Sequence, residues 1–193
     1  MRKNLLGDRP SSRWTLRRRI TRSDRGRQQA TVVILHDESG ALRDSGEKEA
    51  HLGVWESIRA VELSLRRRGH RVRRVSLGSG IRAVVDQLRN FRPEAVFHLA
   101  ETAFGQTSGE SKITALLEIL GIPHTSCPAE SLSICRDKVA VKAVLREYGI
   151  LTPPMAVSFD GRLPKTLPPR PWITKPAQED GSIGIFADSV TAD

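Results

Sequence analysis

A lysine followed by a glycine-bearing loop, near the end of the chain, has the layout of a phosphate-binding hairpin. Residues 172–185 read WITKPAQEDGSIGI, in which Lys175 follows a short apolar run and a loop with glycines at Gly181 and Gly184 leads into a second apolar run. Glycine adopts backbone angles closed to other residues, so N–H groups of the loop can turn toward an anion. The Lys175 ammonium adds a mobile positive charge for a phosphate oxygen. This segment therefore predicts a phosphate or nucleotide site.

The histidines and cysteines lack the spacing that metal sites and disulfide frameworks require. His98 falls in an apolar run, where we expect a core residue rather than a ligand. Cys127 and Cys135 lie eight residues apart without a CxxC pair, which favours neither zinc nor a disulfide. We expect buried or half-buried free thiols, and no metal ligands in this chain.

The net charge of +9 is divided unevenly along the sequence. Residues 1–29 hold ten of the 31 bases and two of the 22 acids, whereas the remainder carries 21 bases and 20 acids. A basic block with almost no apolar face is typical of a disordered arm, so we predict a disordered leader over residues 1–29. The alternative is that translation starts further along. No recognised nucleic-acid-binding motif follows the arm, so we expect no specific nucleic-acid partner.

The apolar content argues for a folded protein outside the membrane. At 38% apolar and 193 residues, the chain can form one domain, or one domain and part of a second. No apolar run reaches the roughly 20 residues that span a bilayer. The first apolar stretch, residues 30–35, is too short and too far from the start for a secretory signal. We expect a cytoplasmic protein without a membrane span.

Strand and helix signals alternate regularly through the first two thirds of the sequence. Apolar runs predict strands, and apolar residues at helical spacing predict the helices between them. The resulting β-α-β-α-β order favours a parallel sheet with right-handed crossovers. We predict an α/β fold with a Rossmann-like domain over residues 30–125. The strands are expected at 31–35, 71–77 and 95–99, and the helices at 54–65 and 81–88.

Helices, a strand and the hairpin are expected in the remaining sequence. An apolar stripe predicts a helix over residues 113–120, and Asp137 is a suitable N-cap for a helix that runs to Tyr148. The pattern at 155–159 predicts a further strand. We assign 126–193 to linking helices and the first hairpin of a second domain, which we expect to be incomplete.

Four sequence motifs follow one another between residues 96 and 185. They are VFHLAETAFGQTSGE (96–110) with ALLEILGIP (115–123), SICRDKVAVK (133–142), YGILTPP (148–154), and the hairpin itself. Together they resemble the D-alanine–D-alanine ligase family of the ATP-grasp superfamily, over roughly residues 30–190. The resemblance implies the N-terminal portion of such an enzyme. It would comprise a Rossmann-like pre-ATP-grasp domain followed by the beginning of an ATP-grasp domain, truncated.

The resemblance also implies an ATP site. In this family the lysines of the DK and KP motifs both contact ATP phosphates, and here they match Lys138 and Lys175. Gly181, Ser182 and Gly184 would complete the ATP-binding loop. Two ammonium groups that converge on a triphosphate offset its charge as the terminal phosphoryl group transfers. Without the resemblance, Lys138 in a first helical turn would be read as a solvated surface residue.

Three residues are candidates on the substrate side. Ser182 matches the second of two consecutive family serines, whereas Gly181 stands where the first, a member of a substrate-side hydrogen-bonded triad, would be. Glu47 matches the glutamate that holds the amino group of the first substrate, although the GG after the family's first strand is absent. Glu101 stands near where many relatives have a histidine and can bind an amine. The simpler interpretations are a solvated helix start for Glu47 and an ordinary loop acid for Glu101.

The implied reaction is ATP-dependent joining of two amino acids, through an acyl phosphate, for peptidoglycan precursor synthesis. The cofactors would be ATP and Mg²⁺, and the family is commonly homodimeric. Its metal ligands come from a C-terminal lobe, so we expect this chain alone to be inactive. Two alternatives stay open. One is another ATP-grasp ligase that joins a different amino-acid pair, and the other is a non-catalytic βαβ remnant with a basic arm.

Overall fold

The structure, a computed structural model, describes residues 29–37, 45–179 and 182–192, with only the backbone described for 45–52. The predicted leader lies outside the described residues, apart from its last position. None of the described helices combines the length and apolar character that a membrane span requires.

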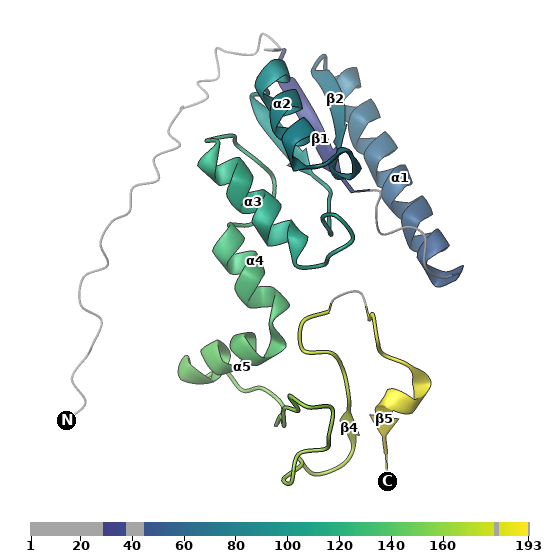
Figure 1. Cartoon of the computed structure of the whole chain (residues 1–193), viewed down its shortest axis with the longest axis vertical. Helices are drawn as coiled ribbons and strands as arrows, with labels where there is room; N and C mark the ends of the chain where they lie inside the picture. The colour runs from purple at the N-terminus through teal and green to yellow at the C-terminus, as the bar shows by residue number, and fades with distance from the viewer. Residues whose placement is uncertain (1–28, 38–44, 180–181, 193) are drawn as a thin grey trace, which may run out of the picture.

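A parallel three-stranded sheet forms the centre of the N-terminal part of the described chain (Figure 1). β1 (Thr31–His36) lies between β2 (Arg71–Ser76) and β3 (Ala95–His98), and both neighbours run parallel to it. Five of the six residues of β1 are buried, as expected of a central strand covered on both faces. The predicted α/β class, with these three strands, is confirmed.

Helices cover both faces of the sheet, because successive residues of β1 point to opposite sides. On one face, Ile34 packs with Ile58 of α1 (Ser45–Arg67). On the other face, Val33 and Leu35 pack with α2 (Ile81–Phe91), which follows a short 3₁₀ turn η1 (Leu77–Ser79), and with α3 (Gly109–Ile119).

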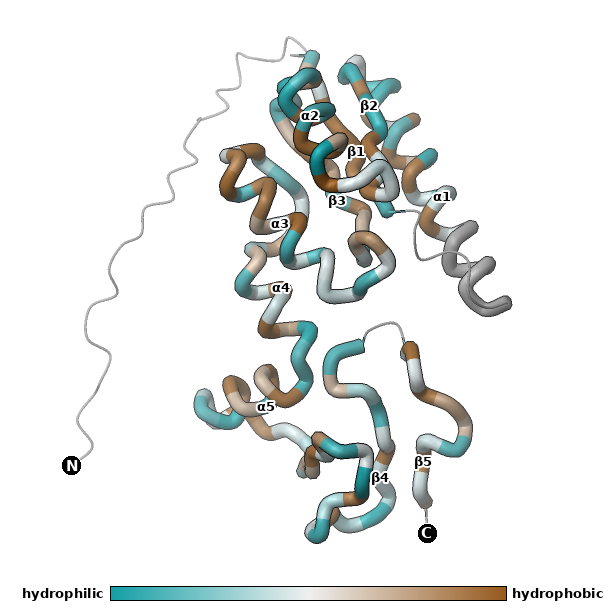
Figure 2. The backbone as a smooth tube through the Cα atoms, in the orientation of Figure 1, coloured by the Kyte–Doolittle hydropathy of each residue, from teal (hydrophilic) through white to brown (hydrophobic). Residues whose placement is uncertain are grey.

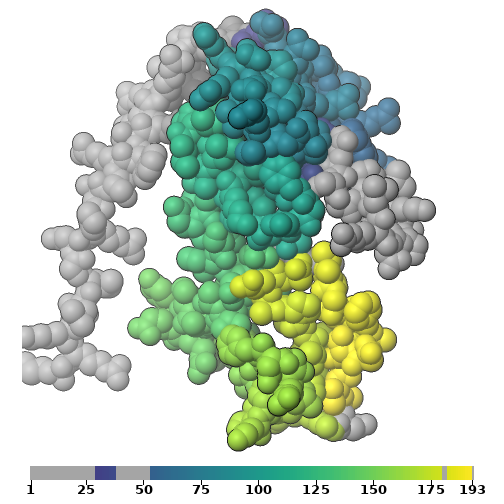
Figure 3. Space-filling view, in the orientation of Figure 1, coloured from purple at the N-terminus to yellow at the C-terminus, as the bar shows by residue number. Residues whose placement is uncertain are grey.

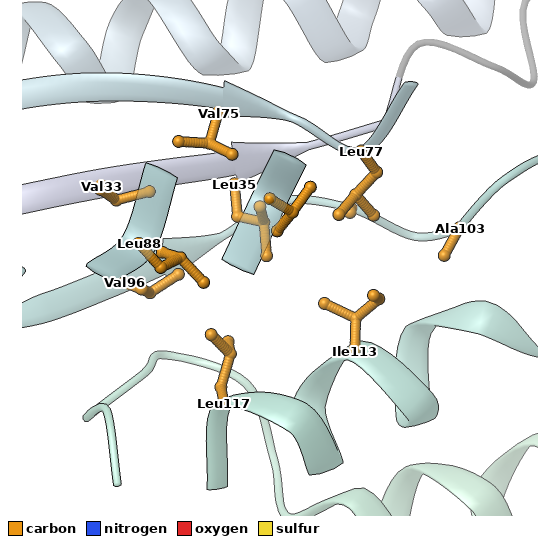
Figure 4. Close-up of a cluster of buried hydrophobic side chains, with 11 residues drawn as sticks. Val33, Leu35, Val75, Leu77, Leu88, Val96, Ala103, Ile113 and Leu117 are labelled. Atoms are coloured by element: carbon orange, nitrogen blue, oxygen red, sulfur yellow. The ribbon is translucent and has the colours of Figure 1, made fainter. Parts of the chain in front are cut away.

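Figure 4 shows the larger of these two clusters. Leu88 of α2 and Leu117 of α3 approach the strand side chains Val33, Leu35 and Val96 from the same face. Each of these side chains is almost completely buried, and burying one apolar side chain of this size contributes about 1.5–3 kcal/mol. This cluster fixes the positions of the sheet and of the loop that leads from β3 into α3.

The chain leaves the sheet through α4 (Ala129–Arg136) and α5 (Lys138–Glu147), and then reaches a small two-stranded sheet (Figure 1). The Asp137 carboxylate caps α5 as predicted, because Oδ1 accepts from the backbone N–H groups of Val139 and Ala140 at 2.9 and 3.0 Å. β4 (Trp172–Ile173) pairs antiparallel with β5 (Val190–Thr191), which follows the 3₁₀ turn η2 (Ala187–Ser189).

Two sequence predictions about this second part are wrong. Residues 155–159 carry no strand, although their apolar pattern predicted one. The returning strand of the hairpin is β5, not the apolar run at 183–185. Positive φ angles at Ser182 (63°) and Gly184 (73°) turn the backbone of that run away from an extended conformation.

Candidate nucleotide-binding site

The β4–β5 hairpin encloses the loop that the sequence predicted to hold phosphate. At its base the Thr174 N–H donates to the Ser189 carbonyl at 2.8 Å. Within the loop, Gly184 approaches Pro176 so closely that an added Cβ would lie 2.7 Å from the proline Cγ. Both its positive φ and this contact require glycine at 184. The hairpin loop therefore has a defined, closed path from 174 to 189, apart from the undescribed residues 180–181.

Lys138 lies directly against this loop. Its backbone N–H donates to the Ala177 carbonyl at 3.0 Å, and its ammonium group donates to the carbonyl of Glu179. Ala177 is two residues beyond Lys175, a separation of at most about 8 Å along the chain. The start of α5 and the segment that carries Lys175 are thus neighbours. An ammonium group has three N–H donors, so its contact with Glu179 leaves two for an anion.

The two residues before Lys138 hold the same loop. Asp137 Oδ2 accepts from Gln178 Nε2 at 2.9 Å, and Arg136 Nη1 donates to the Gln178 carbonyl at 2.6 Å. Arg136 Nη1 also lies 3.2 Å from Thr107 Oγ1, in the segment between β3 and α3. Arg136 therefore joins the hairpin loop to the sheet domain. Figure 3 shows the hairpin, in yellow, packed against the α4–α5 segment, in green.

Hydrogen bonds keep the Asp137 carboxyl ionised at this junction. The backbone N–H of Ala140 and the side chain of Gln178 lower its pKa, and partial desolvation opposes them. The same carboxylate caps α5 with one oxygen and binds the hairpin loop with the other. A single ionised group thus orients both the helix start and the loop.

The other predicted site residues are less closely connected to this loop. Lys175 is exposed after β4, and Gly181 lies outside the described residues. Glu47 belongs to α1, but its side chain is outside what the structure describes. Glu101 is exposed in the segment after β3, next to Thr102, whose hydroxyl donates to Asp37 at 2.9 Å. Ser182 is exposed at the turn of the hairpin loop.

Arg136 and Gln178 were not predicted from the sequence. The only available signal was that Arg136 immediately precedes the DK pair. This position gave no indication of its hydrogen-bond partners Thr107 and Gln178, which are 29 and 42 positions away. The thiols also differ from expectation. Cys127 and Cys135 are free, as predicted, but both are exposed rather than buried.

The histidines near β3 form a structural cluster. Burial, together with the neighbouring His124, lowers the pKa of His98 to about 4, so the ring is neutral at neutral pH. His124 Nδ1 lies 2.9 Å from Ser126 Oγ, which lies 3.3 Å from Thr114 Oγ1. Among the described residues, no three His, Cys, Asp or Glu side chains are grouped so as to hold a metal ion.

Comparison with known proteins gives the family. The chain is 34% identical over 159 residues to the D-alanine–D-alanine ligase of Syntrophotalea carbinolica, covering 82% of this chain and 48% of that protein. It is 33% identical over 143 residues to the ligase of Acidiphilium cryptum, covering 74% and 45%. This chain belongs to the D-alanine–D-alanine ligase family. It spans about half the length of the curated relatives it matches. No protein-family model matches it.

Solved structures of a D-alanine–D-alanine ligase have the same fold. The Bacillus anthracis enzyme complexed with ATP superposes with a TM-score of 0.56 at 19% identity, over 85% of this chain and 50% of that one. A second structure of that enzyme gives a TM-score of 0.52 at 20% identity. The predicted relationship to the D-alanine–D-alanine ligase family and the predicted fold class are confirmed.

Proposed function

We propose that this member of the D-alanine–D-alanine ligase family binds ATP in the hairpin loop, as part of an ATP-dependent carboxylate–amine ligase. The observation that carries the proposal is the contact of Lys138 with the carbonyls of Ala177 and Glu179. Because of this contact, Lys138 of the DK motif lies on the loop that follows Lys175 of the KP motif. The B. anthracis neighbour was solved with ATP, which supports this assignment.

The residues present fit a phosphate group. Gly184 keeps its backbone free of a side chain where a Cβ would collide with Pro176, and Ser182 turns the loop through a positive φ. Backbone N–H groups in such turns form concave anion sites. Lys138 and Lys175 would hold the phosphates, and the loop backbone around Gly181, Ser182 and Gly184 would cradle them.

Bound ATP supplies the phosphoryl group that activates a carboxylate toward an amine. The role of the protein's own residues is electrostatic, because the two lysine ammonium groups offset the negative charge of the triphosphate. The described residues offer no metal cluster, so we place the ligands of the expected Mg²⁺ outside them. The hydrogen bonds of Arg136 and Asp137 to Gln178 keep the loop in position for this task.

On the substrate side we propose that Glu47 and Glu101 bind the amino groups of amino acids, with Ser182 near the reacting carboxylate. Glu101 follows β3, and Arg136 reaches Thr107 six residues later. The same arginine that holds the hairpin loop thus also contacts the segment that carries this glutamate. We assign the products to peptidoglycan precursor synthesis in the cytoplasm, by a homodimer.

We further propose a division into a pre-ATP-grasp domain over 30–125 and the first part of an ATP-grasp domain over 126–193. The parallel sheet β2-β1-β3 lies wholly in the first part and the β4–β5 sheet wholly in the second, which supports this boundary.

A second candidate is a ligase that joins a different pair of amino acids. Gly181 favours it, because a glycine cannot provide the hydroxyl that the family's first serine contributes to the substrate-side triad. Thermal shift with D-alanine, L-alanine and D-serine separates the two candidates. Stabilisation by D-alanine alone supports the D-alanine enzyme, and a stronger effect of another amino acid supports the alternative.

Tryptophan fluorescence tests the proposal of an ATP site. Trp172 begins β4, three residues before Lys175, and is partly buried. Saturable quenching by ATP, and much weaker quenching by adenosine, is expected if the phosphates supply the binding energy. If neither fluorescence nor calorimetry detects ATP, the proposed function is wrong.

A further inference from the structure

The strand β2, at the open edge of the sheet, and the helices α1 and α2 on either side of it carry an exposed arginine surface. We define this surface as the ten arginines between residues 59 and 92, all of them exposed. The segment has no lysine and two acids, a net charge of +8. Residues 30–193 together carry +1, so those outside the segment carry −7. The arginines are Arg59, Arg66, Arg67, Arg68, Arg71, Arg73, Arg74, Arg82, Arg89 and Arg92.

The geometry of β2 distributes these guanidinium groups around one edge of the sheet. β2 pairs with β1 alone, so its other edge is open in the described part of the chain. Arg73 Cζ lies 5.6 Å from the centre of the Phe91 ring in α2, and Arg74 Cζ lies 6.0 Å from that of Trp55 in α1. These cation–π contacts orient the two arginines toward opposite faces. In Figure 2 hydrophilic teal segments alternate with hydrophobic brown ones along α1, β2 and α2.

Among the described side chains, acidic residues neutralise only a small part of this charge. Glu62 pairs with Arg66 at 2.8 Å and with Arg74 at 3.3 Å, so two arginines share one carboxylate. Asp86 is the second acid of the segment. Most of the positive charge is therefore available to a partner.

The start of β1 lies beside the arginine surface. The Arg71 N–H donates to the Ala30 carbonyl at 2.8 Å, so the described chain begins beside the arginine surface. The residues that precede Ala30 carry ten bases and two acids. The other strongly basic stretch of the sequence therefore directly precedes β1 along the chain.

We propose that the arginine surface binds the phosphate backbone of nucleic acid, without sequence preference. Guanidinium groups match phosphate oxygens with paired hydrogen bonds, which lysines do not. Six residues of strand edge span roughly 20 Å, over which a duplex presents about 12 phosphate charges. Such backbone contacts carry no base specificity, in agreement with the expected absence of a specific nucleic-acid partner.

An anionic membrane is the competing partner, and the surface suits it less well. Membrane-surface binding draws on apolar side chains that insert beside the basic ones. In the described residues 53–92, Leu63 and Ile81 are the exposed large apolar side chains, whereas 15 further ones lie between 104 and 190. The basic and apolar surfaces thus lie in different parts of the protein.

Fluorescence anisotropy of the full chain, with a labelled DNA duplex of about 20 base pairs, tests this proposal. The variant is Arg71→Gln, Arg73→Gln and Arg74→Gln together. The matched control is Arg146→Gln, Arg162→Gln and Arg170→Gln, which removes the same charge from exposed positions elsewhere. We expect the first variant to lose about tenfold or more in affinity and to flatten the slope of log affinity against log salt by about 2–3. The control should stay within about twofold of wild type.

Several outcomes would overturn the proposal. They are equal losses in the two variants, no binding by the wild type at about 50 mM salt, or binding only to vesicles of anionic phospholipid. If the strand variant does not fold, Arg67→Gln with Arg68→Gln at the end of α1 replaces it. That pair is expected to flatten the salt slope by about 2, and an unchanged slope would contradict the inference.

Discussion

The backbone N–H of Lys138 donates to the carbonyl of Ala177 at 3.0 Å, across 39 positions of sequence. Helix α5 therefore begins against the loop that follows Lys175. The Lys138 ammonium group adds a second contact, to the carbonyl of Glu179. Two motifs that are separate in the sequence are thereby joined in one place, which is the structural basis of the proposed ATP site.

Gly184→Ala is expected to destabilise the hairpin more than Gly161→Ala. Both glycines have positive φ, 73° and 77°, so each replacement incurs the strain of a left-handed residue, about 1–2 kcal/mol. Only at 184 would the new Cβ also meet Pro176, at 2.7 Å, whereas nothing lies within 4 Å at Gly161. Hydrogen exchange of the 172–191 amides measures the difference. Equal protection in the two variants would contradict the close contact.

Replacing Gly109 and Gly53 by alanine should have opposite effects on stability. A Cβ at Gly109 would collide with the buried Cβ of Ala103, so α3 would have to move from the core. Gly53, within α1, has no neighbour within 4 Å, and alanine there should stabilise the helix by about 0.5–1 kcal/mol. Denaturant unfolding compares the two. A stable Gly109→Ala variant would show that α3 does not pack against Ala103 in this way.

Arg136→Ala is expected to loosen the contact between the hairpin loop and the sheet domain. Arg136 donates to both the Gln178 carbonyl and Thr107 Oγ1, and one such hydrogen bond contributes about 0.5–1.5 kcal/mol. Exchange of the Lys138 amide, whose N–H donates to the Ala177 carbonyl, should therefore accelerate. Thr107→Val should have a smaller effect, because it removes only one of the two contacts. Arg146→Ala, at an exposed position of α5, is the control. The same acceleration in that control would refute the assigned role.

His98→Leu should remove part of the loss of stability in acid. The folded pKa of His98, about 4, is below the unfolded value of 6.5. The unfolded state therefore binds the proton first, and the stability from the neutral ring is present above pH 6.5 and lost as pH falls toward 4. The effect is at most on the order of 3 kcal/mol. Urea unfolding between these pH values measures it. If the variant has the same pH dependence as wild type, His98 is not the responsible group.

Local patterns were sufficient to predict the three-stranded sheet and the helices that cover it. The β-branched run of β1 and the helical stripes of α1 and α2 are properties of neighbouring residues, and they define a parallel sheet without further information. Residues 155–159 have a similar pattern but follow Pro153 and Pro154, and they form no strand. A strand also requires a partner edge, which the local sequence does not reveal.

The site was only partly predictable for the same reason. Lys138, Lys175 and Gly184 carry recognisable motif chemistry, and their expected proximity agrees with the contacts of Lys138. The hydrogen bonds of Arg136 depend on residues brought together by folding, so composition and spacing could not indicate them. The arginine surface was not predicted, because the net charge of residues 30–193 is close to zero. Acids elsewhere in this range offset the charge of the arginines.

Calorimetric titration of ATP against lysine variants tests the central claim most directly. Lys138→Ala and Lys175→Ala are each expected to weaken ATP binding by roughly tenfold or more, because each removes a charge-assisted hydrogen bond to phosphate. Lys165→Ala, at an exposed position of the connector, should bind like wild type. Equal affinities for all three variants, or wild-type affinity in Lys138→Ala, would contradict the proposal that the two motif lysines share one triphosphate.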